Sequence, residues 1–111
     1  MSKDRIALQT IIEALEKIEK NVALFRNAEE FYNDSLHFDA VMMNFVIIGE
    51  MVARISPEFK AQYSHIEWER IKGFRNLIAH DYFGIDAEEV WQIATTRLHK
   101  LKKEIGEILN N

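Results

Sequence analysis

One short stretch of the sequence gathers polar side chains that could act together on a phosphate. It runs from residue 75 to residue 82 and contains Arg75, Asn76, His80, Asp81 and Tyr82. The planar guanidinium of an arginine can give a phosphate two parallel charge-assisted hydrogen bonds. Histidine is the side chain whose ordinary pKa allows proton transfer near neutral pH. Together, Arg75 and His80 suit cleavage of a phosphodiester without a metal, with the arginine holding the charge that grows on the phosphoryl oxygens.

Helical geometry restricts how these side chains could meet. At about 100° per residue, Arg75 and His80 lie about 140° apart on one helix, whereas Asn76 and His80 share a face. Arg75 and His80 therefore converge on one phosphate only if the helix end distorts or a second chain contributes. A two-fold symmetric dimer would bring two such sets together. The other interpretation is that these residues only cap carbonyls and pair with neighbours at a helix end.

The rest of the chain predicts an all-helical single domain over residues 1–111. Four Gly and one Pro are too few for the turns of a sandwich or barrel, and 48% of the residues are hydrophobic. Apolar residues recur at helical spacing, which favours an up-and-down four-helix bundle with one or two extra short helices. The expected helices cover residues 4–22, 27–32 and 36–55, a restart at Ser56-Pro57-Glu58, a segment from a Ser64–Glu67 capping box to about residue 80, and residues 86–109.

Composition narrows the function classes. The absence of Cys excludes disulfides, thiolate metal sites and cysteine nucleophiles. A net charge of -4 argues against a broadly basic nucleic-acid coat, and no DNA partner is expected. The start of the chain does not resemble a signal peptide, and no apolar run is long enough for a membrane span, so we expect a cytoplasmic protein without a membrane partner.

Two carboxylates and one arginine leave alternatives open. Glu50 lies on the most apolar helix, where it either orients Arg75 or His80 or sits at an exposed helix end. Asp81 could be a metal ligand, but capping or orienting a neighbour is the simpler role. The histidines are scattered, so no metal site is predicted. Arg97 interrupts the apolar stripe of the last helix, and it either points inward to a polar site or snorkels.

The chain resembles the HepT family of HEPN-domain ribonucleases, which are the toxins of MntA–HepT toxin–antitoxin systems. The resemblance covers nearly the whole chain. The residues that carry it are, in order, Ile48-Gly49-Glu50, Trp68, Arg75-Asn76, Ala79-His80-Asp81-Tyr82 and Val90-Trp91.

This resemblance implies a HEPN fold and a homodimer with its active site at the interface. It implies metal-independent cleavage of an RNA substrate, with Arg75 and His80 as the catalytic pair, Asn76 as a polar helper and no cofactor. It also implies an antitoxin partner, an MntA-like nucleotidyltransferase that transfers AMP from ATP onto Tyr82. The rival interpretation is a non-catalytic HEPN bundle that binds a nucleotide or a substrate for such a nucleotidyltransferase.

The position of Tyr82 also invites a geometric prediction. Tyr82 lies seven residues after Arg75, close to two helical turns, so the two side chains share a face if the helix persists that far. An AMP group on Tyr82 would then put its phosphate beside Arg75 and compete with RNA. The alternative is a tyrosine packed under the last helix with its hydroxyl on a backbone carbonyl.

Overall fold

The computed structural model describes residues 2–110, apart from the side chain of residue 77. Within that range every regular element is a helix, so the all-helical prediction is confirmed. The helices are α1 (Lys3–Val22), α2 (Ala28–Asn33), α3 (Ser35–Arg54), α4 (Pro57–Gln62), α5 (Trp68–His80), α6 (Ala87–Gln92), a π-helical turn (Ile93–Arg97) and α7 (Leu98–Leu109).

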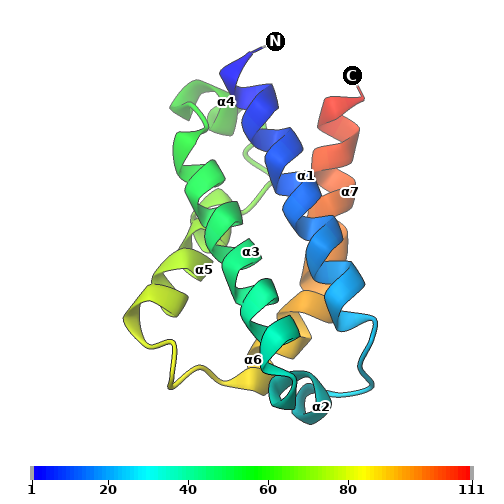
Figure 1. The fold of residues 1–111 in the computed structure, drawn as a ribbon. Helices are drawn as coiled ribbons and strands as arrows, with labels where there is room; N and C mark the ends of the chain where they lie inside the picture. The colour runs from blue at the N-terminus through cyan, green and yellow to red at the C-terminus, as the bar shows by residue number, and fades with distance from the viewer. Residues whose placement is uncertain (1, 111) are drawn as a thin grey trace.

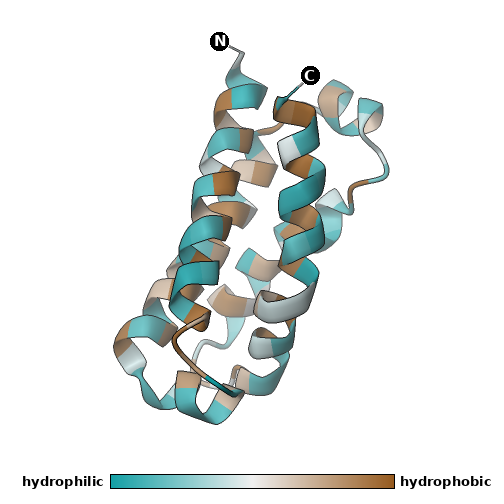
Figure 2. Cartoon of the chain, turned by 90° about the vertical axis from the view of Figure 1, so that its right-hand side faces the viewer, coloured by the Kyte–Doolittle hydropathy of each residue, from teal (hydrophilic) through white to brown (hydrophobic). Residues whose placement is uncertain are grey.

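Four long rods form the bundle that the sequence predicts. The helix α3 packs against both α1 and α5, and α1 also packs against α7 (Figure 1). The last rod is continuous, because α6 passes through the π-helical turn directly into α7. The short helices α2 and α4 lie at opposite ends of the bundle. The buried apolar side chains of the rods form one core cluster. Brown apolar and teal polar residues alternate along each rod, as expected for helices with one apolar face (Figure 2).

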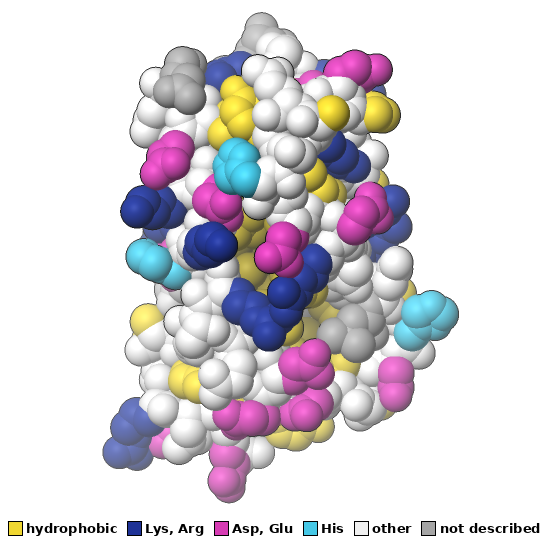
Figure 3. Space-filling model, turned by 180° about the vertical axis from the view of Figure 1, so that it is seen from behind, with side chains coloured by type: hydrophobic (Ala, Val, Ile, Leu, Met, Phe, Trp, Pro, Cys, Tyr) yellow, Lys and Arg dark blue, Asp and Glu magenta, His cyan; other side chains and the backbone are white. Residues whose placement is uncertain are grey.

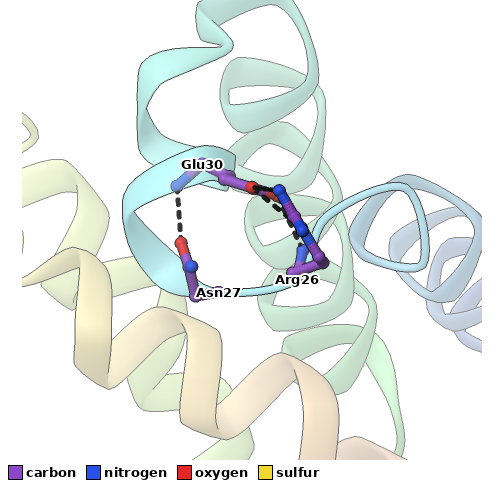
Figure 4. Close-up of polar contacts among 3 residues, drawn as sticks. All are labelled: Arg26, Asn27 and Glu30. Carbon is purple, nitrogen blue, oxygen red and sulfur yellow. Dashed lines mark hydrogen bonds and ion pairs between the residues drawn. The ribbon is translucent and has the colours of Figure 1, made fainter.

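Several helix starts follow the capping rules. The Ser56 hydroxyl accepts the Phe59 N–H with Pro57 as first helical residue, and the Asp86 carboxylate accepts two N–H groups at the start of α6. At α2 the Asn27 side chain accepts the Glu30 N–H, and the Glu30 carboxylate accepts hydrogen bonds from the backbone and guanidinium of Arg26 (Figure 4). These bonds from Arg26 hold the pKa of Glu30 below its usual value.

The predicted capping box at Ser64 is wrong. The helix α5 begins at Trp68, four residues after that serine, and Glu67 provides the first carbonyl by accepting the Ile71 N–H. The intervening turn is held by buried Ile66 and by the Trp68 indole, which donates to the Tyr63 carbonyl at 3.1 Å. Burial of two large apolar side chains therefore overrides the local capping signal.

Of the two alternatives for Arg97, the structure agrees with snorkelling, because the exposed side chain lines a groove with apolar residues. Arg97 neither points into the core nor faces a buried polar site: it is exposed, and Leu98 is buried instead. The buried stripe continues at three-four spacing through Ala94, Leu98, Leu101 and Ile105, so it passes through Leu98 and leaves the neighbouring Arg97 outside.

The central helix α3 is the most apolar. By length and composition alone it would suit a membrane span. In the bundle, however, its apolar side chains pack the interior between α1 and α5, including Val41, Met42, Phe45, Ile48 and Val52. Its apolar character thus fits a central position with neighbours on two sides.

Candidate active site along helices α3 and α5

Gly49 lets α5 approach α3 closely at the centre of the site. A Cβ built at this position would lie 2.6 Å from the Cβ of Arg75 and 3.3 Å from the Lys72 carbonyl oxygen. Real Cβ atoms do not come so close to such neighbours, so any side chain at residue 49 would push the two helices apart. The glycine therefore sets the position of Arg75 against α3.

Arg75 forms an ion pair with the residue that follows this glycine. Its Nη1 lies 3.1 Å from Oε1 of Glu50, and the exposed fractions of the two side chains are 26% and 47%. Of the alternatives for Glu50, the structure shows the ion pair with Arg75, and its role in orienting a site stays a prediction. Only Nη1 of the guanidinium donates to Glu50. The other N–H groups of Arg75 can therefore still donate to a bound anion, while the carboxylate fixes the orientation of the side chain.

His80 lies on a different side of α5 from Arg75. It is the last residue of the helix, and its side chain is exposed, as is that of Asn76 one turn earlier. Among the described residues, no side chain forms a hydrogen bond with the His80 imidazole. The helix stays regular through this region, so the roughly 140° separation of Arg75 and His80 is retained.

Asp81 shapes the connection that follows. Its carboxylate accepts the backbone N–H of Gly84 at 2.9 Å, so it caps a tight turn. A Cβ on Gly84 would collide with that carboxylate, which explains the small residue there. The structure agrees with capping for Asp81. No cluster of three or more metal-ligating side chains occurs in the described part of the chain.

Tyr82 is not beside Arg75. The helix ends at His80, so the condition for a shared face is not met. The Tyr82 hydroxyl instead donates a short hydrogen bond to the Asp39 carboxylate on α3, and its ring meets Phe38 edge-on. The alternative prediction, a hydroxyl bound to a backbone carbonyl under the last helix, is wrong as well. Asp39 is eleven residues before Glu50, so the tyrosine and arginine contacts lie about 16 Å apart along α3.

Asp39 is a site residue that sequence reasoning missed. A signal was available, because Asp39 and Glu50 are the two carboxylates of the otherwise apolar helix α3. Burial of the phenol, together with the nearby Asp39 carboxylate, raises the pKa of Tyr82 to about 12. Tyr82 is therefore a neutral hydrogen-bond donor at physiological pH.

Exposed apolar side chains surround the Tyr82 end of the site. Phe83 is 96% exposed and Leu36 is 77% exposed, and Met43 and Tyr32 are also largely open to solvent. Leu36 and Met43 are two turns apart and lie on one side of α3 with Asp39. Large apolar residues gathered in this way are typical of a surface that contacts another molecule.

Comparison with known proteins identifies the family. The model of the ribonuclease HepT-like family matches residues 8–108. The chain belongs to the HepT-like family. The suggested resemblance is therefore confirmed, and the fold is the all-helical bundle expected of such a chain.

Several relatives of this HepT-like chain are named after ribonucleases. A Thermococcus cleftensis protein named a probable ribonuclease HepT is 32% identical over 101 residues, which cover 91% of each chain. A Caldanaerobacter subterraneus protein named as a candidate RNase is 32% identical over 81 residues, covering 73% of this chain and 72% of the relative.

A longer relative combines two named activities. A Methanocaldococcus jannaschii protein, named a gamma-glutamylcyclotransferase and candidate RNase, is 33% identical over 110 residues. The match covers 98% of this chain, which spans only 49% of that protein. No solved structure matches the chain.

Proposed function

We propose that this HepT-like protein is a metal-independent endoribonuclease that acts in the cytoplasm as a homodimer. The observation that carries the proposal is the pairing of an oriented arginine with a solvent-accessible histidine on α5. Glu50 orients Arg75 at 3.1 Å, and His80 at the helix end is free to reach a substrate. Membership of the ribonuclease HepT-like family supports RNA as the substrate.

The proposed chemistry uses the ribose next to the scissile phosphate. His80 accepts the proton of the 2′-hydroxyl while that oxygen attacks phosphorus, and the bond from phosphorus to the 5′ oxygen breaks. The leaving 5′ oxygen takes a proton from a second imidazolium. Arg75 stabilises the extra negative charge on the non-bridging oxygens. The products are a cyclic phosphate and a free 5′-hydroxyl.

Two copies of the chain would supply the second imidazole. Arg75 and His80 diverge on one helix, so a composite site from two α5 helices is the simplest way to direct both at one phosphate. The exposed apolar residues Leu36, Met43 and Phe83 lie next to the site and would be covered in such a pairing.

We further propose that the protein is the toxin of a toxin–antitoxin pair, inactivated by a nucleotidyltransferase antitoxin that transfers AMP from ATP onto Tyr82. The tyrosine oxygen would attack the α-phosphorus, pyrophosphate would leave, and the hydroxyl proton would be released. Because the Tyr82 hydroxyl faces Asp39, the added phosphate would meet a carboxylate and repel it. Inactivation would then follow from displacement of the loop after His80 as well as from added bulk.

The decisive experiment is an RNA cleavage assay with the purified chain in EDTA. The wild-type protein should cut RNA, and Arg75→Ala and His80→Ala should each lose roughly a hundredfold or more in rate. His99→Ala, which removes an exposed imidazole on α7, is the matched control and should keep full activity. Cleavage that survives His80→Ala or disappears with EDTA would contradict the mechanism.

Sedimentation tests the dimer, and mass spectrometry tests the modification. A chain that remains monomeric at tens of micromolar, a generous range for a weak interface, would contradict the composite site.

Incubation with a nucleotidyltransferase partner and ATP should add AMP to Tyr82 of the wild-type protein, and the Tyr82→Phe variant should not be modified. Absence of cleavage combined with Arg75-dependent nucleotide binding would favour the non-catalytic binding subunit instead.

A further inference from the structure

A groove between α5 and α7 lies on the other flank of α5 from the Arg75–Glu50 pair. It is a pocket of about 270 Å³ lined by residues of both helices and of the turn before α5. The other neighbouring rods of the bundle pack along their lengths, but α5 and α7 do not make an extensive contact in the described part of the chain. The fourth side of the bundle is therefore left open.

The groove has an apolar floor and a charged rim. Its floor is formed by Ile71, Phe74, Leu98 and Leu101, and Phe74 is itself held edge-on against Phe45 of α3. From behind, dark-blue basic side chains cluster at the middle of this face beside a yellow apolar recess (Figure 3). An apolar floor with a few convergent polar groups is the usual composition of a small-ligand site.

The charges on the rim are not balanced. Arg70 forms an ion pair with Glu67 at 3.1 Å, whereas the Glu104 carboxylate lies 3.9 Å from His65, a contact that is an ion pair only when the imidazole is protonated. Arg97 and Lys100 line the same groove, and neither pairs with an acid among the described residues.

Arg97 and Lys100 lie close together in sequence, where the π-helical turn ends and α7 begins. Arg97 is the last residue of that turn, and Lys100 is three residues on, in α7. Both side chains are exposed at the rim of the groove, outside the buried stripe of Leu98 and Leu101. An arginine fork and a lysine ammonium on adjacent turns suit the oxygens of one phosphate. Such π-helical turns are frequent at functional sites.

We propose that this groove binds one nucleotide unit, with its phosphate on Arg97 and Lys100 and its base on the apolar floor beside Phe74. A volume of about 270 Å³ is just below the usual range of about 300–1,000 Å³ for ligand pockets, so the groove has room for no more than a single nucleotide. Stacking on an aromatic ring accepts any base, so the subsite selects for phosphate and ring, not for sequence. The nucleotide could belong to an RNA chain or be free.

The subsite differs from the proposed catalytic centre in position and residues. It uses the α7 flank of α5, whereas Arg75 faces Glu50 on the α3 flank. Binding in this groove does not require cleavage, so it can be tested independently of the proposed ribonuclease activity. For a chain of net charge -4, a local pair of unpaired cations gives an anionic ligand a defined point of attachment.

Equilibrium binding tests the subsite without any need for activity. The probes are AMP, ATP and a labelled single-stranded RNA with 2′-O-methyl riboses, which resists cleavage at the 2′-oxygen. The double variant Arg97→Ala/Lys100→Ala should weaken binding by roughly tenfold or more, the scale of one or two lost hydrogen bonds to a charged group. Lys103→Ala is the matched control, because Lys103 is an exposed lysine on α7 outside the groove.

Photo-crosslinking shows which residues of the chain lie next to the bound nucleotide. RNA or AMP with a photoreactive base should attach to peptides that contain residues 70–74 or 97–101. Binding of AMP as well as RNA would show that free nucleotides occupy the subsite, and binding of RNA alone would assign it to the RNA chain. The proposal is overturned if no probe binds, if the double variant binds as tightly as Lys103→Ala, or if the crosslinks lie elsewhere.

Discussion

The two ends of the α3–α5 face are built in opposite ways. At one end Arg75 meets Glu50 as a charged pair between two helices, locked by the close approach at Gly49. At the other end Tyr82 meets Asp39 through a neutral hydroxyl, and the tyrosine is carried by a loop. The first contact depends on helix packing, and the second depends on a single hydrogen bond and aromatic neighbours.

Under the proposed function, the helix-held contact positions Arg75 for catalysis, and the loop-held contact keeps Tyr82 at the site of modification. A guanidinium that must hold a phosphate benefits from a support that does not move, because small displacements in an active site are costly in rate. A side chain that receives a covalent group must be reachable, and a loop allows that. Substitutions at the helix-held end should therefore affect stability and activity together, whereas those at the loop-held end should leave the bundle nearly intact.

The largest effect is expected for Gly49→Ala. The new methyl group would meet the Arg75 Cβ at 2.6 Å, so α3 and α5 must separate, at a cost of about 1–3 kcal/mol in the free energy of unfolding. Gly73→Ala in α5 is the control, because nothing lies within 4 Å of its new Cβ. It should be stabilising by roughly 0.5–1 kcal/mol. Denaturant unfolding of both variants measures the contrast, and equal stabilities would remove the close-approach argument.

Glu50→Gln should change activity more than stability. The ion pair is partly exposed, so its loss should cost less than about 1 kcal/mol of unfolding free energy. The arginine loses its anchor, and RNA cleavage should fall by roughly tenfold or more. Glu16→Gln on the exposed face of α1 controls for the loss of one negative charge. Wild-type cleavage by Glu50→Gln would show that Arg75 needs no support.

Tyr82→Phe should cost about 0.5–1 kcal/mol of unfolding free energy, because one partly exposed hydrogen bond to Asp39 is lost. Tyr32→Phe is a close control: Tyr32 also contacts Phe38 edge-on, and its hydroxyl has no partner among the described residues. Thermal unfolding should separate the two variants. A Tyr82→Phe protein that is as stable as Tyr32→Phe would show that the loop is held by packing alone.

The smallest effect concerns the Tyr82 pKa in Asp39→Asn. Removing the carboxylate should lower the pKa from about 12, but burial, the larger cause, should keep it above the ordinary 10.0. In the wild type the folded pKa exceeds the unfolded one, so this group's stabilising contribution is lost as pH rises from about 10 through about 12. Tyrosinate absorbance, with Tyr82→Phe subtracted, measures the shift. An unchanged pKa would mean that Asp39 has no influence on the phenol.

Much of the fold followed from local patterns in the sequence. The apolar spacing predicted the long helices, and Ser56 and Asp86 predicted two of the starts correctly. The partnership of Glu50 with Arg75 was also predictable, because a carboxylate on an apolar helix needs a partner. These inferences rest on interactions within a few residues or on a strong energetic requirement.

Other features depend on the fold as a whole. The start of α5 at Trp68 reflects burial of Ile66, which a capping pattern does not register. The π-helical turn before α7 has no distinct residue signature, so the sequence did not predict it. Tyr82 could not be placed by helical spacing, because the helix ends two residues earlier and the partner Asp39 is far away in sequence.

The two chain ends emerge together at one end of the bundle (Figure 1), where the Arg5 guanidinium donates to the Leu109 carbonyl at 2.6 Å. The Tyr82 loop is at the opposite end, about the 30 Å length of α1 away. For protein engineering, this means that a fluorescent group attached near residue 2 or residue 110 would lie at the end of the bundle opposite the Tyr82 loop. Such a group should therefore leave access to the Tyr82 loop undisturbed.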